Sequence, residues 1–246
     1  MTDTILKIIN MLPNPEADII EGVKWGRCDQ LFTPAYWKVQ YHLHEDIFCK
    51  DFYRMSDNLI EEICSCILGG FGIKSEMAVL AFERLRDLDL LLPGTSFGQL
   101  HVALTVPFFY KSHWVRYRFP KQKAKYLAEL LNRGDLHLIP GENDYNLREW
   151  LLTVSGIGMK TASWVTRNWL NSRNVAILDI HIYRAGLLAG FFNTTKCLTK
   201  DYKKMERNYL DFSSALGVDA ANLDALIWLQ LKETNELAIE ILKLKN

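Results

Sequence analysis

The sequence predicts an all-α protein, and three observations support this fold class. Apolar residues recur at the spacing of an amphipathic helix along most of the chain, whereas convincing alternation of polar and apolar residues does not occur. The seven prolines mark breaks between the periodic segments. The composition is that of an ordinary globular protein, with 49% hydrophobic and 24% charged residues among 246. We therefore expect many short helices rather than a disordered or fibrous chain.

The individual helices follow from the same periodicity. It predicts helices, in chain order, over residues 58–68, 75–87, 122–132, 147–154, 162–170, 200–215 and 220–244. Asn146 is the expected N-cap of the fourth helix, because Glu149 follows it three residues later. Two segments, 100–110 and 175–178, look β-like instead, and the second is short enough to be an extended connection.

The net charge is zero, from 29 basic and 29 acidic residues, but the charges are unevenly distributed. Residues 111–184 hold 12 basic and 6 acidic residues, a balance of 12 − 6 = +6. The densest part, residues 111–125, has no acid and mixes cations with aromatic residues: Lys111, Arg116, Arg118, Lys121, Lys123 and Lys125, beside Tyr110, Trp114, Tyr117 and Phe119. Such a cluster suits phosphate binding, although a solvated helix face would have the same composition.

Two short clusters of potential metal ligands have simpler interpretations. The first comprises His42, His44, Glu45 and Asp46. The spacing of its histidines suits a strand and no second cluster accompanies it, so we expect a polar surface segment and no metal site. The second, Cys64 and Cys66, lies in an apolar helical pattern, so we expect buried reduced thiols.

Membrane insertion and export are not expected. No apolar run approaches the roughly 18 residues that a membrane span needs. Asp3 and Lys7 interrupt the apolar start of the chain, which does not match a secretory signal. The odd total of five cysteines is typical of a reducing compartment.

The strongest chemical signal is the segment from Leu151 to Ala162, in which Gly156-Ile157-Gly158 separates two amphipathic patterns. Glycines permit a tight turn and let main-chain amides approach a ligand closely. A helix that begins directly after them points unpaired N–H groups at that ligand, which suits a phosphate. The pattern predicts a helix–hairpin–helix that grips a nucleic-acid backbone, although Gly-x-Gly alone would also fit a structural corner between helices.

Lys160 and Asp179 make the chemical interpretation more specific. Lys160 opens the second helix, where the helix dipole disfavours a cation, so the amine is expected to lose its proton readily and act as a nucleophile. A lysine that reaches solvent or a phosphate would be the simpler alternative. Asp179 follows the apolar run 175–178 and precedes a further helical pattern, so it is the expected N-cap there and lies beside an apolar wall.

These motifs resemble the helix–hairpin–helix DNA glycosylase superfamily, and most closely its bifunctional 8-oxoguanine DNA glycosylase/AP lyase branch. Gly156 to Lys160 is followed after nineteen residues by Asp179 and then His181, and the likeness is continuous from Arg148 to Leu188. Weaker likeness extends over residues 118–126 and 223–234. The four-cysteine iron–sulfur cluster of another branch is not expected, because only Cys197 follows the hairpin, and no cofactor is implied.

The resemblance implies two all-α subdomains with the active cleft between them. One would comprise residues 60–165, and the other would combine 1–59 with 166–246. It implies that Lys160 attacks C1′ of a damaged nucleotide flipped out of double-stranded DNA and that Asp179 stabilises the charge that develops on the sugar. DNA-binding roles are implied for Gly156, Gly158, Thr161, His181, Arg118, Lys121, Lys123 and Lys125. His181 could equally serve packing.

The base pocket is expected to contain Asp224 and Trp228, which share one face of a helix, and Phe71. An indole face can stack on a purine, and a carboxylate can accept the N7 proton that distinguishes 8-oxoguanine from guanine. Relatives place a polar wedge in the gap that a flipped base leaves, whereas this chain has Ile67-Leu68-Gly69-Gly70-Phe71-Gly72, so Phe71 would have to fill it.

Two alternative functions stay open. One is a glycosylase of the same superfamily for another damaged or modified base, and the other is a DNA-binding module without activity. The expected protein is a monomer that acts at the chromosome, in the cytoplasm of a prokaryote or the nucleus of a eukaryote.

Overall fold

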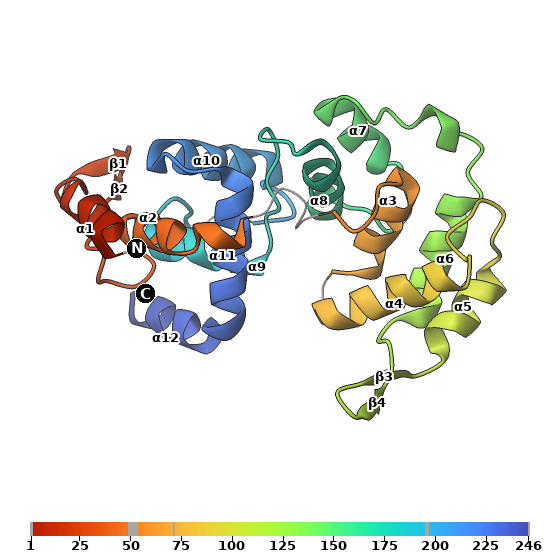
Figure 1. Ribbon diagram of the computed structural model, residues 1–246. Helices are drawn as coiled ribbons and strands as arrows, with labels where there is room; N and C mark the ends of the chain where they lie inside the picture. The colour runs from red at the N-terminus through yellow and green to blue at the C-terminus, as the bar shows by residue number, and fades with distance from the viewer. Residues whose placement is uncertain (1, 49–53, 71, 195–196, 246) are drawn as a thin grey trace. The chain divides into compact units, whose positions relative to one another are not determined.

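The computed structural model describes residues 2–48, 54–70, 72–194 and 197–245, and it is mainly helical, as predicted (Figure 1). The chain forms two compact units, Met1–Phe52 with Arg173–Asn246, and Tyr53–Ser172. The prediction divided the chain at 59/60 and 165/166 instead. The second division falls inside one continuous helix, which runs to Leu170.

The unit of residues 53–172 contains six helices in its described part and one β-hairpin. Its helices are α3 (Leu59–Leu68), α4 (Ser75–Asp87), α5 (Phe97–Thr105), α6 (Pro120–Leu131), α7 (Asp144–Leu151) and α8 (Met159–Leu170), with a short 3-10 turn at Leu136–Leu138. The predicted helix over 75–87 is confirmed, and those over 58–68 and 122–132 are confirmed to within two residues. Asn143, not Asn146, caps α7, because its side chain accepts a hydrogen bond from the Asn146 N–H group.

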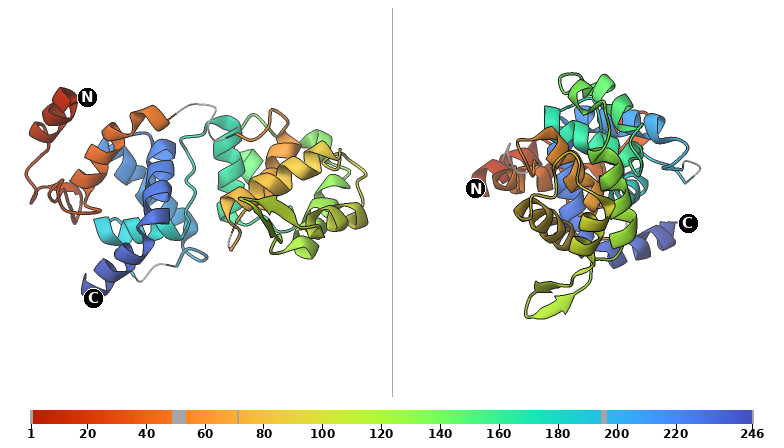
Figure 2. Two further views of the ribbon diagram at one scale, coloured as in Figure 1. Left: turned by 60° about the horizontal axis from the view of Figure 1, so that its bottom comes forward. Right: turned by 90° about the vertical axis from the view of Figure 1, so that its right-hand side faces the viewer.

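The hairpin of this unit is a departure from the all-helical expectation. The β-like segment 100–110 is helical as far as Thr105 and then enters strand β3 (Phe108–Tyr110), which pairs with β4 (His113–Val115) in antiparallel register. Figure 2 shows this hairpin projecting from the helices of its unit. Each strand has only three residues, too few for alternation to be visible in the sequence.

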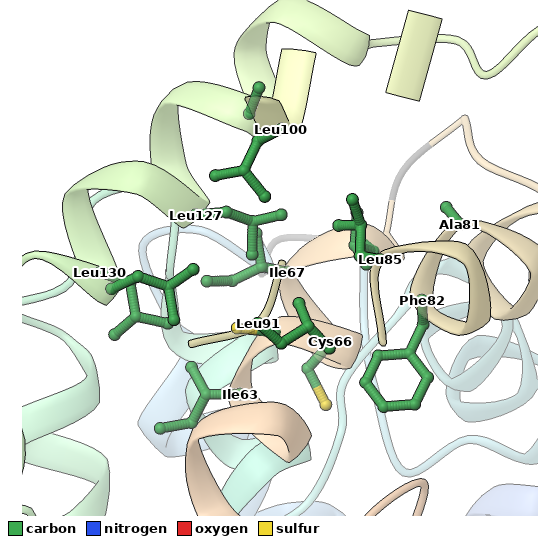
Figure 3. Close-up of a cluster of buried hydrophobic side chains, with 14 of the residues drawn as sticks. Ile63, Cys66, Ile67, Ala81, Phe82, Leu85, Leu91, Leu100, Leu127 and Leu130 are labelled. Carbon is green, nitrogen blue, oxygen red and sulfur yellow. The ribbon is translucent and has the colours of Figure 1, made fainter. Parts of the chain in front are cut away.

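The core of this unit is continuous through its helices (Figure 3). Ile63, Ile67 and Phe82 are at most 1% exposed and pack with leucines of α5 and α6. Cys64 and Cys66 are buried and free, as predicted, and burial raises the pKa of both thiols. The core extends to Leu151, Val154 and Ile157, so apolar side chains hold the segment that joins α7 to α8 against the core of this unit.

The other unit combines both ends of the chain. Its elements are α1 (Thr2–Asn10), strands β1 (Asp18–Ile20) and β2 (Val23–Lys24), α2 (Pro34–Leu43), a 3-10 turn (Glu45–Ile47), α9 (Ile180–Ala189), α10 (Tyr202–Leu216), α11 (Ala220–Glu233) and α12 (Asn235–Lys245). The helix predicted over 220–244 is therefore two helices, because Thr234 ends α11 and its hydroxyl donates back to Gln230 O. Trp37, Tyr209 and Phe212 are fully buried in the core of this unit.

The strand expected around His42 and His44 is wrong. His42 is in the last turn of α2, and its Nδ1 lies 2.5 Å from Glu45 Oε1. His44 is the C-cap of the same helix and bonds Gln40 O. Among the described residues, no three His, Cys, Asp or Glu side chains group as metal ligands. None of the described helices has the length and apolar character of a membrane span.

Candidate functional site

The glycine segment forms the turn of a helix–hairpin–helix, as predicted. Helix α7 ends at Leu151, α8 begins at Met159, and the intervening residues form hydrogen-bonded turns in which Ile157 N–H donates to Val154 O at 3.1 Å. Val154 and Ile157 are at most 7% exposed, which fixes the turn to the core of its unit.

The two glycines of the turn serve different purposes. Gly156 has φ +82°, and a Cβ atom there would lie 2.2 Å from Cδ2 of Tyr126. Both the backbone conformation and the ring of α6 therefore require glycine at this position. Gly158 has an ordinary φ of −102°, and a Cβ atom there would meet nothing within 4 Å. The fold itself does not require glycine at position 158.

Gly158 is the N-cap of α8 and has no side chain with which to cap it. The first turn of α8 therefore has no side-chain cap on its N–H groups, and the positive end of the helix dipole lies there. This is the geometry in which a phosphate oxygen can approach closely, and a side chain at Gly158 would stand in its path. The open surroundings of Gly158 support the predicted role in backbone binding.

Lys160 is the second residue of α8 and is half-buried, like its neighbours Met159 and Thr161. The first turn of α8 contains no acidic residue. Lys160 therefore carries a primary amine in the same helix turn that has no acidic side chain and no side-chain cap. A neutral primary amine is a nucleophile toward an electrophilic carbon.

Asp179 caps α9, as predicted. Its Oδ1 accepts hydrogen bonds from the His181 N–H group at 2.8 Å and the Ile182 N–H group at 3.0 Å. The side chain is 9% exposed and follows Val175–Leu178, four residues that are each at most 7% exposed. Asp179 therefore follows a buried apolar segment and is itself buried, and an apolar wall beside its carboxylate stays a prediction.

Two side chains of α10 hold the extended segment that leads to Asp179. Tyr202 donates its hydroxyl proton to Ala176 O at 2.7 Å and accepts from the Leu178 N–H group at 3.1 Å. Glu206 Oε1 accepts from the Ala176 N–H group at 3.0 Å. These polar contacts satisfy main-chain groups of a buried extended segment that belongs to no sheet, and they fix the position at which Asp179 enters α9.

The basic segment before α6 contains side chains with different roles. Lys121 and Lys125 are exposed, and Lys125 Nζ lies 3.7 Å from Glu129 Oε1. Lys123 does not belong to this surface set. It is half-buried, and its Nζ donates to Ile67 O at 2.6 Å and Gly69 O at 2.9 Å. It binds the last carbonyls of α3, and burial lowers its pKa to about 8.

Arg118 also forms a hydrogen bond within the protein. Its Nη1 donates to Gly72 O at 3.1 Å, although the side chain is exposed. Lys123 and Arg118 thus support the segment that follows α3. Both were predicted to bind DNA from the density of cations in residues 111–125 and from the family resemblance, but a cation that binds carbonyls of another element has the same sequence signal as one that binds phosphate.

The predicted base-pocket residues lie on α11. Asp224 is 6% exposed, Trp228 is half-buried, and Lys232 Nζ lies 5.1 Å from the indole centroid. These residues form a stripe at i, i+4 and i+8 on one face of the helix. Trp228 is therefore accessible in part, unlike the core tryptophan Trp37. Phe71, the third predicted member, lies outside the described residues.

Lys160 lies in the unit of residues 53–172, and Asp179 and Trp228 lie in the other unit. The supporting roles of Tyr126, Tyr202 and Glu206 could not be predicted from the sequence. Tyr202 and Glu206 stand four residues apart on one helix, which is a visible pattern, but their partners are main-chain groups that no side-chain pattern reveals.

Comparison with known proteins gives consistent matches. Residues 48–218 match the family described as 8-oxoguanine DNA glycosylase. An 8-oxoguanine DNA glycosylase/AP lyase of Metallosphaera sedula is 31% identical over 173 residues, which are 68% of this chain and 78% of the relative. A protein of the same description from Saccharolobus solfataricus is 33% identical over 131 residues, and the match covers 50% of this chain and 62% of that relative.

Two solved structures share the fold. The 8-oxoguanine DNA glycosylase of Thermotoga maritima aligns with a TM-score of 0.56 at 21% identity, over 81% of this chain and 88% of that chain. The enzyme of Methanocaldococcus jannaschii aligns with a TM-score of 0.57 at 21% identity, over 95% of both chains. The predicted resemblance is confirmed by the sequence matches and the predicted fold class by these structures.

Proposed function

The chain belongs to the 8-oxoguanine DNA glycosylase family, and from this premise we propose that it excises 8-oxoguanine from double-stranded DNA and then cleaves the strand at the abasic site. The observation that carries the proposal is the position of Lys160. It follows the open N-cap Gly158 in the first turn of α8, so the turn that binds a phosphate also presents an amine. A module that only binds DNA has no need of that amine.

The chemistry proceeds through a covalent intermediate. The lone pair of the Lys160 amine attacks C1′ of the flipped nucleotide, the glycosidic bond breaks, and its electron pair leaves with the base, which takes up a proton. The carboxylate of Asp179 stabilises the positive charge that develops on the sugar. Loss of a proton from the attacking nitrogen and opening of the sugar give a Schiff base. Removal of a C2′ proton then expels the 3′ phosphate by β-elimination.

Recognition of the base is assigned to the stripe on α11. The indole of Trp228 offers a flat face to the purine ring, and a base on that face takes the place of the Lys232 ammonium. Asp224 supplies an acceptor for the N7 proton of 8-oxoguanine, directly or through a neighbouring group. The proposed reaction uses residues of one chain, and we propose that the protein acts as a monomer. The natural location is where chromosomal DNA lies, the prokaryotic cytoplasm or a nucleus.

The test is activity on a panel of duplexes that each contain one damaged or modified base, with borohydride present to trap the Schiff base. We expect preferential trapping on the 8-oxoguanine duplex. Lys160→Gln should lose trapping and strand cleavage while it retains DNA binding, whereas the control Lys121→Gln should keep both. Undiminished trapping with Lys160→Gln would remove that residue from the mechanism, and preference for another base would favour the alternative specificity.

Trp228→Ala separates base recognition from strand cleavage. Excision should fall about tenfold or more, because base–aromatic stacking contributes about 1–3 kcal/mol. Cleavage of a pre-formed abasic site should stay near the wild-type rate, because it needs only the amine. Equal loss on both substrates would make Trp228 a structural residue instead.

A further inference from the structure

The β-hairpin of residues 108–115 has no role in the proposed reaction or in the proposed recognition of the base. Its strands pair Phe109 with Trp114 and Tyr110 with His113, and Lys111 and Ser112 form a two-residue loop. Both loop residues have positive φ, +46° and +67°, as a tight I′ turn requires. Glycine or asparagine usually occupies such positions, so this turn carries a cation at its tip where the backbone favours a residue without a long side chain.

The two faces of the hairpin differ sharply in burial. Phe108 is 3% exposed and Val115 is half-buried, so this face packs on the unit. On the opposite face Phe109 is 62% exposed and Trp114 is 70% exposed. Their ring centroids lie 5.3 Å apart at an interplanar angle of 61°. Two adjacent large aromatic rings in solvent form an apolar surface that the fold of this unit leaves uncovered.

The entry to the hairpin is held firmly. The guanidinium of Arg84 on α4 donates to the carbonyl groups of Ala103 and Pro107 at 3.0 and 2.9 Å, and to that of Val106. It also lies 3.3 Å from the ring centroid of Phe108. The hairpin is therefore fixed to α4 and α5 at its base, and the exposed pair is presented on a rigid support.

Two residues that follow strand β4 form hydrogen bonds with the end of α3 and with the segment after it. Tyr117 donates its hydroxyl proton to Leu68 O at 2.5 Å, and Arg118 donates to Gly72 O at 3.1 Å. This is the segment that the sequence assigns to filling the gap left by a flipped base. The base of the hairpin and that segment are thus joined by direct hydrogen bonds within one unit.

The charge around the aromatic pair indicates its partner. The sequence contains no acidic residue between Asp89 and Glu129, and Lys111 and Arg116 are exposed on either side of Trp114. Phe109 also borders a hollow whose lining includes two acids, Glu83 and Asp87, and one cation, Arg84. Cations beside exposed aromatic rings match a polyanion with flat bases, so the flank of Trp114 is the side that suits nucleic acid.

We propose that the hairpin of residues 108–115 is a second DNA-binding element, in which Lys111 and Arg116 bind phosphates and Trp114, supported by Phe109, stacks on a base that becomes unstacked next to the extruded nucleotide. This inference rests on the proposed action on DNA but not on the identity of the excised base. Bases of an intact duplex hide their faces, so the aromatic contact forms only where the duplex is opened. The cationic contacts form with any duplex.

This division of labour is testable by equilibrium binding to two labelled duplexes, one intact and one with a stable abasic analogue. Trp114→Ala should weaken binding to the abasic duplex about tenfold and change binding to the intact duplex by less than about twofold. Trp114→Tyr should restore most of the difference. Lys111→Gln with Arg116→Gln should weaken both complexes alike and lower the slope of log K against log[salt] by about 1.8.

Leu92→Ala is the matched control, because Leu92 is an exposed apolar residue of the same unit at 54% exposure. Its two affinities should be unchanged. Wild-type affinities in Trp114→Ala, or an equal loss in Leu92→Ala, would overturn the proposal. Both duplexes lack 8-oxoguanine, so a failure of the proposed base specificity leaves this measurement intact.

Photo-crosslinking places the contact directly. Duplexes with one 5-iodouracil at successive positions around the abasic analogue should crosslink to a peptide that contains Trp114, and only at positions beside the opened site. Crosslinks that map elsewhere in the protein while the Trp114 peptide stays unmodified at every position would contradict the proposal.

Discussion

The first turns of α8 and α9 differ in whether a side chain of the protein accepts hydrogen bonds from their main-chain N–H groups. Asp179 caps α9 with its own carboxylate, which accepts from the His181 and Ile182 N–H groups. The N-cap of helix α8 is Gly158, which has no side chain, and the first turn of α8 carries Lys160 instead of an acid. One helix start is capped by a negative charge of the protein, and the other has no side-chain cap.

The difference shows how a stability rule can be broken at a functional position. An acid in the first turn of α8 would stabilise the isolated helix, yet it would repel the phosphate that the open N–H groups can bind. At α9 the same rule is obeyed, and the cap is a buried carboxylate that follows the buried residues 175–178. The two helix starts therefore carry side chains of opposite charge.

The largest expected effect tests whether the cap of α9 is more than a cap. Asp179→Asn removes the negative charge and keeps a side chain that caps well, so excision should fall about 10²–10³-fold. The free energy of unfolding should change by less than about 1–2 kcal/mol. Single-turnover rates on an 8-oxoguanine duplex and urea unfolding measure the two effects.

Asp219 provides the matched control for that prediction. It caps α11 in the same unit, with Oδ1 accepting from the Ala221 and Asn222 N–H groups at 3.0 and 3.1 Å. Asp219→Asn should leave excision within about twofold. If both variants lose activity equally, or if Asp179→Asn only unfolds, the role of Asp179 is that of a cap.

The second prediction separates the two glycines that precede α8. Gly156→Ala places a methyl group at positive φ and against the ring of Tyr126, so it should cost about 2–4 kcal/mol of folding free energy. Gly158→Ala meets no neighbour and should cost less than about 1 kcal/mol. It should nevertheless weaken binding to duplex DNA about tenfold, because the methyl group occupies the path of the phosphate.

Thermal unfolding and binding to an intact duplex measure these effects. We expect the melting temperature to fall by at least about 5 °C in Gly156→Ala and to change little in Gly158→Ala. Gly134→Ala, at another position with open surroundings, is the control. Wild-type DNA affinity in Gly158→Ala would show that the open start of α8 is not a phosphate site.

The sequence was sufficient for the parts that depend on local chemistry. Helical period gave α4 over residues 75–87, the paired glycines gave the turn before α8, and the aspartate after an apolar run gave the cap of α9. Each of these depends on residues within a few positions of one another. Local propensity and capping act over that range, so one stretch of sequence contains the whole cause.

The parts that the sequence did not reveal depend on distant partners. Lys123 lies among exposed cations in the sequence, but its ammonium binds carbonyls of α3 more than fifty residues away. Gly156 needs glycine partly because Tyr126 of α6 packs over it. The hairpin at 108–115 has strands too short to show a period, and a guanidinium of α4 holds it. These features depend on packing between residues that are distant in the sequence, and the periodicity of the sequence does not reveal such contacts.

The third prediction extends the comparison to α6, another helix start with cations. Its N-cap is Phe119, and its first turn contains no acid. Replacing the exposed Lys121 and Lys125 by Gln should weaken binding to intact and lesion duplexes alike and lower the slope of log K against log[salt] by up to about 1.8. A selective loss on the lesion duplex would place these lysines at the base pocket. Binding titrations at several salt concentrations measure the slope.

The smallest expected effect concerns Lys123, the cation of α6 that binds the protein instead. Burial lowers its pKa to about 8 in the folded chain, below the ordinary lysine value of about 10.4. Between these two values the unfolded chain binds more protons at this group, so its contribution to the free energy of unfolding rises with pH. The carbonyl groups of Ile67 and Gly69 favour the ammonium form and solvent screens part of the burial, so the rise should be on the order of 1 kcal/mol.

Urea unfolding of the wild type and Lys123→Met from pH 7 to pH 10 isolates this contribution, because other titrating groups cancel in the difference. The free energy of unfolding of the wild type minus that of the variant should be constant below about pH 8 and increase above it. Lys125→Met, at an exposed lysine of the same helix, is the matched control for the loss of a lysine from α6. A flat difference for Lys123→Met would mean that its ammonium form persists through this pH range, stabilised by the carbonyl groups of Ile67 and Gly69.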